Sequence, residues 1–155
     1  QKSDYFQETS EKPKVSLKFR KKFNLKEVEK KLSEVYDDKR WEKIADRCLS
    51  CAGCTVVCPT CYCFEVDDVN DFDGNVERKR FWSSCLLQTF TRVAGDFSFR
   101  KSRVSRIKQF IYHKILYYKE KFGVNLCVGC GRCIEICPVG IDFFKEAEKI
   151  VGVRK

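Results

Sequence analysis

The sequence has no methionine among its 155 residues, and it contains only one histidine and three prolines. No apolar run approaches the roughly 20 residues that a membrane-spanning helix needs, and no segment resembles a secretory signal. We expect that Gln1 is not the translational start and that the chain is a processed or incomplete piece of something longer. It also lacks a phosphate-cradling glycine motif and a nucleophile–base pair, so we predict that it does not catalyse a reaction alone.

The formal charge of +9 comes from 31 Lys and Arg that are interleaved with 22 Asp and Glu. This interleaving favours solvated helix faces. Two alternatives stay open: a docking surface for an acidic protein partner, and binding of nucleic acid. Hydrophobic residues make up 43% of the chain, which is enough for a packed core.

Eleven cysteines are many for a chain of this length, and most of them fall into two tight runs. Each run has the spacing C-x2-C-x2-C-x3-C-P: residues 48–59 and residues 127–138. Clustered thiols of this kind indicate metal ligation in a reducing compartment rather than a disulfide framework. We therefore expect a cytoplasmic protein.

This spacing is typical of iron–sulfur ligation, because a four-iron cubane needs four thiolates and three of them converge from one loop. In ferredoxins with this run, the fourth Cys ligates the other cluster. Two [4Fe–4S] clusters are therefore expected. The first takes Cys48, Cys51, Cys54 and Cys137; the second takes Cys127, Cys130, Cys133 and Cys58. Structural zinc is a poor alternative, because zinc sites use paired C-x2-C knuckles with a longer spacer.

Small and apolar residues in the runs suit such clusters. Gly53, Gly129 and Gly131 should permit turns that leave amides free to point at sulfur. We expect the following residues to wall the clusters from water: Val56, Val57, Ile134 and Ile136.

Three cysteines remain outside this scheme, Cys61, Cys63 and Cys85. They could be spare thiols near a cluster, part of a further metal site, or a redox-active pair. His113, the single histidine, lies in a basic, aromatic segment where packing is a commoner role than ligation. The aromatic residues around it are expected to be core or interface: Phe110, Tyr112, Tyr117 and Tyr118.

The pattern along the chain predicts a mainly α fold with a little β structure, built on a bacterial 2[4Fe–4S] ferredoxin-like core. Residues 1–23 should form an extended arm, and residues 24–155 the dicluster domain, with 59–126 as an insertion between the two cluster motifs. Helices are expected after an Asn24–Glu27 capping box, before Cys48, over 86–94, from Ser102 to Gly123 and, after the second run, in a last helix with Ile141 on its apolar face. A hairpin is expected over 65–82, with its turn at 73–75.

One ordered set of motifs resembles a known family. It comprises CPTCYCF at 58–64, WSSC at 82–85, YHK at 112–114 and CVGCGRC at 127–133. The set resembles dicluster ferredoxin-type subunits, which include the beta subunit of sulfhydrogenase-type NiFe hydrogenases and the equivalent ferredoxin-type subunit of anaerobic sulfite reductase. The resemblance covers about residues 40–142. It implies electron transfer between a flavin subunit that handles NAD(P)H and a catalytic subunit, and it carries over the eight ligands named above. Family members usually have a sizeable N-terminal domain, which we do not expect within these 155 residues.

We therefore expect an electron-transfer subunit with two [4Fe–4S] clusters in a cytoplasmic oxidoreductase complex of the hydrogenase or sulfite/sulfur reductase type. Its electron donor would be a flavin/NAD(P)H or ferredoxin-dependent subunit. A free-standing soluble ferredoxin is the first alternative, although such proteins are often compact and acidic. A nucleic-acid-binding protein with structural clusters is the second.

Overall fold

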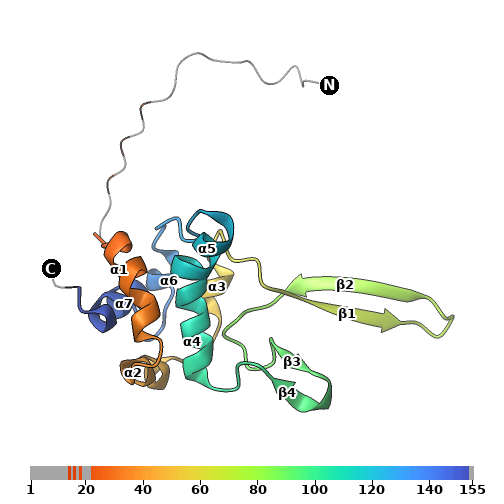
Figure 1. Ribbon diagram of the computed structural model, residues 1–155. Coiled ribbons are helices and arrows are strands. Elements are labelled where there is room, and N and C mark those ends of the chain that lie inside the picture. Colours follow the sequence, from red (N-terminus) through yellow and green to blue (C-terminus); the bar gives the residue numbers. More distant parts are fainter. Residues whose placement is uncertain (1–13, 15, 17, 19–21, 154–155) are drawn as a thin grey trace.

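The computed structural model describes residues 14, 16, 18 and 22–153. The extended arm expected over residues 1–23 falls almost entirely outside the described residues and stays a prediction. Helices make up most of the regular structure in the described part, and two small antiparallel sheets complete it (Figure 1). The expectation of a mainly α chain with a little β structure is confirmed at this level.

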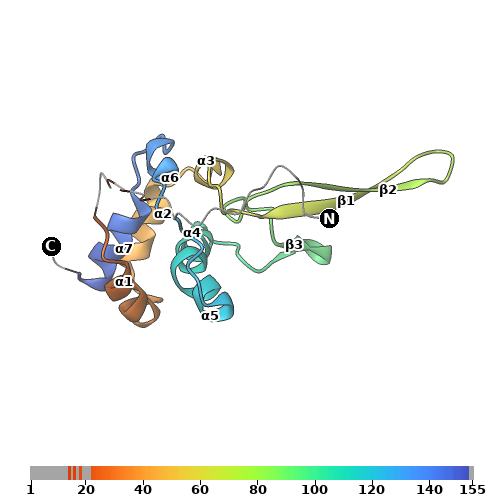
Figure 2. The same cartoon turned by 90° about the horizontal axis from the view of Figure 1, so that it is seen from above.

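Four helices surround the hydrophobic core. They are α1 (Leu25–Leu32), α2 (Arg40–Arg47), α4 (Arg103–Tyr112) and α7 (Phe143–Val151). α2 packs against both α4 and α7, and α1 packs against α7, so the two ends of the described chain meet (Figures 1 and 2). The apolar stripes of these helices supply the fully buried side chains: Val28, Leu32, Trp41, Ile44, Ile107, Phe110, Ile111, Ala147 and Ile150.

The start of α1 is fixed by a modified capping box. The Glu27 N–H donates to Asn24 Oδ1 at 3.4 Å, and Asn24 Nδ2 donates to Glu27 Oε2 at 2.9 Å. In a standard box the Glu would accept from the backbone N–H of the capping residue. Here that N–H donates to Glu148 Oε1 instead, at 2.9 Å. The cap therefore also ties α1 to α7.

The helical run predicted from Ser102 to Gly123 is present, but its hydrogen-bond pattern changes midway. α4 passes into a π-helical segment, His113–Tyr117, and then into α5 (Tyr118–Phe122). Gly123 ends the run with a φ of 76°. A π-turn rotates the side chains that follow it relative to those of a continuous α-helix. The apolar face of this helical run is therefore not continuous from α4 to α5.

The two cysteine runs contribute one short helix each, α3 (Gly53–Val56) and α6 (Arg132–Glu135). Both begin after a left-handed residue, Ala52 with φ 63° and Gly131 with φ 77°. α3 and α6 pack against each other, so runs that are far apart in the sequence lie together.

The predicted hairpin is confirmed as β1 (Phe64–Asn70) and β2 (Val76–Trp82), paired antiparallel from Phe64↔Trp82 to Asn70↔Val76. Its turn is held by Asp71, whose Oδ1 accepts the backbone N–H groups of Asp73 and Asn75. The hairpin projects away from the helical body (Figures 1 and 2).

The helix predicted over Leu86–Ala94 is wrong. The segment forms isolated turns and then β3 (Arg92–Val93), which pairs with β4 (Phe97–Ser98). The Arg106 side chain is 6% exposed, and its Nε donates to the Leu86 carbonyl at 3.0 Å. Its Nη1 donates to the carbonyls of Arg100 and Lys101. The Leu86 carbonyl, which would accept a backbone hydrogen bond in a helix, therefore accepts one from a side chain of α4.

In the described part of the chain, no helix combines the length and the apolar character that crossing a membrane requires.

Candidate iron–sulfur site

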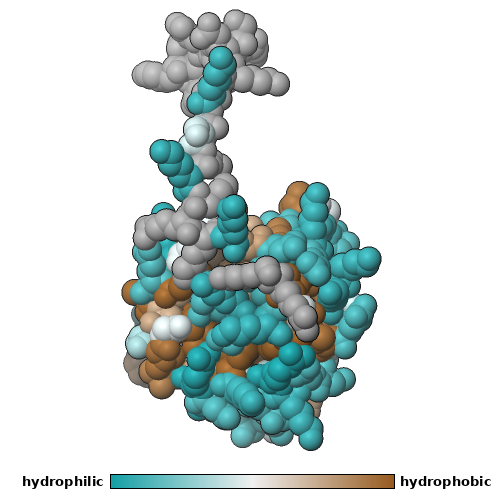
Figure 3. All heavy atoms as spheres, turned by 90° about the vertical axis from the view of Figure 1, so that its left-hand side faces the viewer, coloured by the Kyte–Doolittle hydropathy of each residue, from teal (hydrophilic) through white to brown (hydrophobic). Residues whose placement is uncertain are grey.

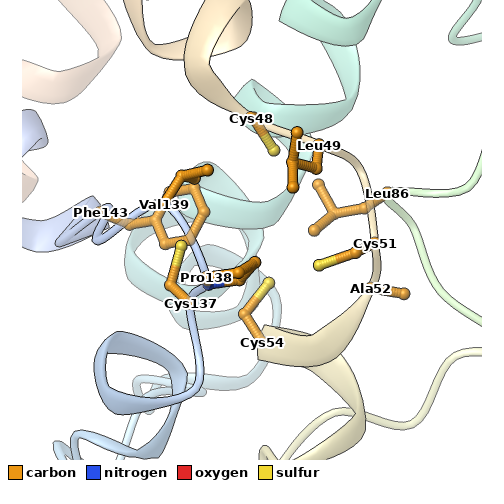
Figure 4. A pocket seen from close by; sticks show the side chains of 10 residues that line it. All are labelled: Cys48, Leu49, Cys51, Ala52, Cys54, Leu86, Cys137, Pro138, Val139 and Phe143. Atoms are coloured by element: carbon orange, nitrogen blue, oxygen red, sulfur yellow. The ribbon is translucent and has the colours of Figure 1, made fainter.

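The first cavity collects three thiols of the first run and one of the second. Cys48, Cys51, Cys54 and Cys137 surround an empty volume of about 300 Å³. Figure 4 shows their sulfur atoms directed toward the same space. The remaining lining is apolar: Leu49, Ala52, Leu86, Pro138, Val139 and Phe143.

Backbone turns in the first run aim its thiols at this cavity. Cys48 ends α2, and the two residues with left-handed backbone that follow it are Ser50 (φ 52°) and Ala52 (φ 63°). The Ser50 N–H donates to Cys48 Sγ at 3.4 Å, and the Ile141 N–H donates to Cys137 Sγ at 3.3 Å. Amides therefore point at sulfur, as the sequence led us to expect.

The expected role of glycine is confirmed only for the second run. Gly129 and Gly131 have φ values of 69° and 77°, and the Gly129 N–H donates to Cys127 Sγ at 3.4 Å. Gly53 instead starts α3 with a helical backbone, and the sharp turn falls on Ala52. The interpretation of Gly53 as a turn residue is wrong, because the left-handed position comes one residue earlier.

The second cavity has the complementary composition. Cys58, from the first run, lines it together with Cys127, Cys130 and Cys133 around an empty volume of about 310 Å³. Its other lining residues are Thr60, Lys114, Val128, Gly131 and Phe144. The two cavities are thus related by an exchange of the fourth cysteine of each run, Cys58 for Cys137.

The two cavities lie close to each other. Burial is the main cause that raises the pKa of the Cys54 thiol in the first cavity, and the next largest cause is Cys133 of the second cavity. Burial likewise raises the pKa of Cys133, to about 11. The packing of α3 against α6 brings these two thiols together.

The donor set fits a four-iron cluster better than a single ion. Among the described residues, no three Cys, His, Asp or Glu side chains converge closely enough to hold one metal ion. A zinc ion needs four ligands at about 2.0–2.3 Å. A cubane is larger, and its four irons bind thiolates that stand apart around it, as the four thiols do around each cavity.

The apolar residues that shield the cavities from water differ from those expected. Val56 is 77% exposed and Ile136 is 49% exposed, so neither shields a cavity from water. Leu86 and Phe143 are instead buried against the first cavity, at 1% and 2% exposure. These shielding residues come from segments outside the cysteine runs, and the local sequence around the runs does not identify them.

Lys114 is a residue that the sequence did not single out for a role. It lies in the π-helical segment, is 3% exposed, and its Nζ donates to Cys58 Sγ at 2.9 Å. Burial acts to raise the pKa of the Cys58 thiol, but the hydrogen bonds from Lys114 and Thr60 outweigh it and lower that pKa to about 7. Burial also acts to lower the pKa of Lys114, which the hydrogen bond to Cys58 raises. The second cavity thus has a buried ammonium in its lining, whereas among the described residues no charged side chain lines the first. The buried Arg106 interacts with Cys48 of the first cavity, but its side chain donates to backbone carbonyls.

The three remaining cysteines line a third cavity, with an empty volume of about 240 Å³. Cys61, Cys63 and Cys85 share it with Tyr62, Phe110, His113, Lys114 and Leu126. A hydrogen bond from Cys85 is the main cause that lowers the pKa of Cys63, to about 6, against the effect of burial. The same hydrogen bond, together with burial, raises the pKa of Cys85.

His113 makes the packing contacts expected of it. Its Nε2 lies 3.3 Å from the Tyr62 hydroxyl, and its ring packs edge-on against the rings of Tyr62 and Tyr118. Burial lowers its pKa, which favours the neutral imidazole.

Comparison with known proteins agrees with this arrangement. The family model described as a 4Fe-4S dicluster domain matches residues 47–141. The sulfhydrogenase 2 subunit beta of Pyrococcus furiosus is 39% identical over 132 residues, which are 85% of this chain and 39% of that protein. The F420-dependent formate dehydrogenase subunit beta of Methanocaldococcus jannaschii is 27% identical over 127 residues, or 82% of this chain and 25% of that protein. The chain thus spans well under half the length of these relatives. No solved structure matches it.

Proposed function

Because the chain belongs to the family of 4Fe-4S dicluster domains, and so carries two [4Fe–4S] clusters, we propose that it relays electrons inside a larger oxidoreductase complex. The observation that carries this proposal is the pair of adjacent four-thiol cavities, with Cys54 of one beside Cys133 of the other. Closely spaced clusters suit transfer from one to the next.

We assign the ligands from the residues that line each cavity. The first cluster takes Cys48, Cys51, Cys54 and Cys137. The second takes Cys58, Cys127, Cys130 and Cys133. Each [4Fe–4S] cluster supplies reversible one-electron chemistry, and its potential depends on burial and on hydrogen bonds to its sulfurs. The arrangement of the two runs about these cavities supports a ferredoxin-like core interrupted by residues 59–126.

The surrounding protein performs three tasks in this proposal. Amides of Ser50, Gly129 and Ile141 donate to ligand sulfurs and so stabilise negative charge. Leu86 and Phe143 exclude water from the first cluster. Lys114 donates a charged hydrogen bond to a ligand sulfur of the second cluster, whereas the buried Arg106, which interacts with Cys48 of the first, donates to backbone carbonyls.

The proposed partners are other members of the complex, a flavin subunit on one side and a catalytic subunit on the other. The two relatives are named as beta subunits, one of a sulfhydrogenase and one of a formate dehydrogenase. The projecting hairpin supports a partner surface, because Phe72 at its tip is fully exposed and Trp82 is 76% exposed. The complex would be of the hydrogenase or sulfite/sulfur reductase type, in the cytoplasm, where thiols stay reduced.

The test is anaerobic native purification of the whole complex, with mass-spectrometric identification of the chains that co-purify. The proposal expects flavin-containing and catalytic subunits, together with about eight iron and eight acid-labile sulfide per chain for two cubanes. Reduction should give electron paramagnetic resonance signals of [4Fe–4S] clusters. A chain that purifies alone with the same metal content would be a free-standing ferredoxin, and zinc in place of iron would refute the proposal.

A further inference from the structure

The base of the long hairpin brings two of the unassigned thiols together. Cys63 precedes β1, and Cys85 follows β2 by three residues. The ladder continues past the Phe64↔Trp82 pair, because the Ser83 N–H donates to the Cys63 carbonyl at 3.0 Å. Strand pairing therefore fixes Cys63 beside the segment that carries Cys85, and the two side chains line the same small cavity.

The surroundings of the two thiols are unequal. Cys85 is 6% exposed, whereas Cys63 is half-buried and lies in the field of two cations, Lys114 and Arg100. An accessible thiolate near positive charge is the form of cysteine that attacks sulfur, and a buried thiol beside it suits the resolving partner. The two thiols thus have the asymmetry of a redox-active dithiol.

The third thiol of the cavity takes no part in this pair. Burial raises the pKa of Cys61, and the other groups that influence this pKa are Lys114 and Cys58, on the side of the second cluster. In the part of the chain that the structure describes, no group of three potential ligands can hold one metal ion. A single metal ion is therefore not favoured here, and a cluster would need a fourth ligand besides Cys61, Cys63 and Cys85.

We propose that Cys63 and Cys85 form a redox-active dithiol that exchanges electrons with the two clusters. In the oxidising direction an S–S bond of about 2.05 Å forms between the two sulfurs, and the thiols release two protons and two electrons. Two [4Fe–4S] clusters in the oxidised state take one electron each, so the step balances. Cys85 lies in the electrostatic neighbourhood of Cys54, beside the first cluster. This inference rests on the proposed function for its electron source.

The test is an anaerobic coulometric titration of the purified complex, oxidised with thionine and then reduced with dithionite, with the iron content measured in parallel. Electrons taken up by this chain are counted as the difference between complexes with the wild-type and the variant chain. The inference expects the Cys63→Ser and Cys85→Ser complexes each to take up two electrons fewer than wild type. Cys61→Ser is the matched control and should take up as many as wild type, with iron content unchanged in all.

A second measurement needs no variant. The oxidised and reduced complexes are denatured in acid, alkylated and digested with trypsin, which cleaves between the two cysteines at Lys79. A Cys63–Cys85 cross-link should appear only in the oxidised sample. Equal electron uptake by all variants without a cross-link would overturn the inference and leave the relay intact. About twelve iron per chain, lost in part in Cys61→Ser, would overturn it in favour of a third cluster. A reversible cross-link in a protein without iron would sustain the dithiol and sink the proposed relay.

Discussion

At the scale of single residues, Lys114 distinguishes the two clusters. Its ammonium group is buried and donates to Cys58 Sγ of the second cavity, whereas Arg106, a buried cation that interacts with Cys48 of the first, donates to backbone carbonyls instead. A positive charge at a ligand favours the reduced cluster, which is one unit more negative. The second cluster is therefore expected to have the higher reduction potential and to be the first of the two to be reduced.

Replacing Lys114 tests this difference. In Lys114→Met the potential of the second cluster should fall by roughly 65–130 mV, since a charged hydrogen bond contributes about 1.5–3 kcal/mol and about 59 mV corresponds to a tenfold change for one electron. A redox titration followed by electron paramagnetic resonance measures both potentials. Lys108→Met, on α4 with its ammonium over the Tyr36 ring, is the control and should shift neither. Equal shifts in both clusters would contradict the assignment.

A second residue-scale prediction concerns the protonation of Cys63. The hydrogen bond from Cys85 lowers its pKa to about 6 from an ordinary value of 9.0, so the reactive thiolate is present above pH 6 and is lost as pH falls below it. Alkylation of Cys63 by iodoacetamide should be half-maximal near pH 6 and decline about tenfold per unit below. Peptide mass spectrometry of briefly labelled protein gives this rate at each pH.

Cys85→Ala removes the donor and should move the midpoint of that profile toward higher pH. The lowered pKa of Cys63 also contributes to the free energy of unfolding. This contribution stabilises the fold above the ordinary pKa of the thiol and is lost as pH falls through about 6. An unchanged midpoint in Cys85→Ala would mean that the cations alone set the pKa.

At the scale of elements, the β1–β2 hairpin exposes apolar side chains that its own packing does not need. A two-stranded hairpin is only marginally stable alone in water, and this one projects from the helical body with Phe72 fully exposed (Figures 1 and 2). Figure 3 shows the side of the molecule on which α1 and α7 lie. This face is in contrast largely hydrophilic, with scattered hydrophobic patches. The hairpin is therefore the element that we expect to enter a partner protein.

Phe72→Ser should weaken partner binding and leave the clusters intact, because the side chain contacts no part of the core. Co-purification from cells, quantified against the tagged chain, should drop at least several-fold, with iron content and thermal midpoint unchanged. Phe122→Ser, which removes a ring that is 53% exposed on α5, is the control and should retain the partners. Loss of iron in Phe72→Ser would show that the hairpin instead supports the cluster site.

At the scale of the whole molecule, the proposed exchange of Cys58 for Cys137 makes the clusters part of the fold. The fourth cysteine that lines each cavity comes from the other cysteine run. With these ligands the bound clusters would tie together the two ends of residues 59–126, which begin after Cys58 and end before Cys127. They stabilise the assembled chain in the same way that structural metals stabilise other small domains.

The exchange predicts which cluster a distant substitution removes. Cys137→Ala should damage the cluster held mainly by Cys48, Cys51 and Cys54, although residue 137 belongs to the second run. Cys133→Ala is the matched variant and should damage the other cluster. The two signals can be separated in the spectra of reduced samples by their different potentials. If both variants removed the same cluster, each run would hold its own four ligands.

The sequence alone determined the chemistry. The two C-x2-C-x2-C-x3-C-P runs predict their cofactor, because the spacing of thiolates along a loop is a local property of a short segment. The hairpin and the ends of the long helical run were also predictable, since the turn at Asp73-Gly74 and the stop at Gly123 are local signals. The helix predicted over 86–94 failed, because the distant Arg106 binds the Leu86 carbonyl.

Only the tertiary structure decided what surrounds each cavity. A buried lysine opposite Cys58, a wall made by Leu86 and Phe143, and the meeting of Cys63 with Cys85 all join residues from separate elements. No local pattern encodes these contacts, because each depends on how α3, α4, α6 and the hairpin pack. The sequence thus specifies two [4Fe–4S] clusters, and the packing specifies the charges and thiols that surround them.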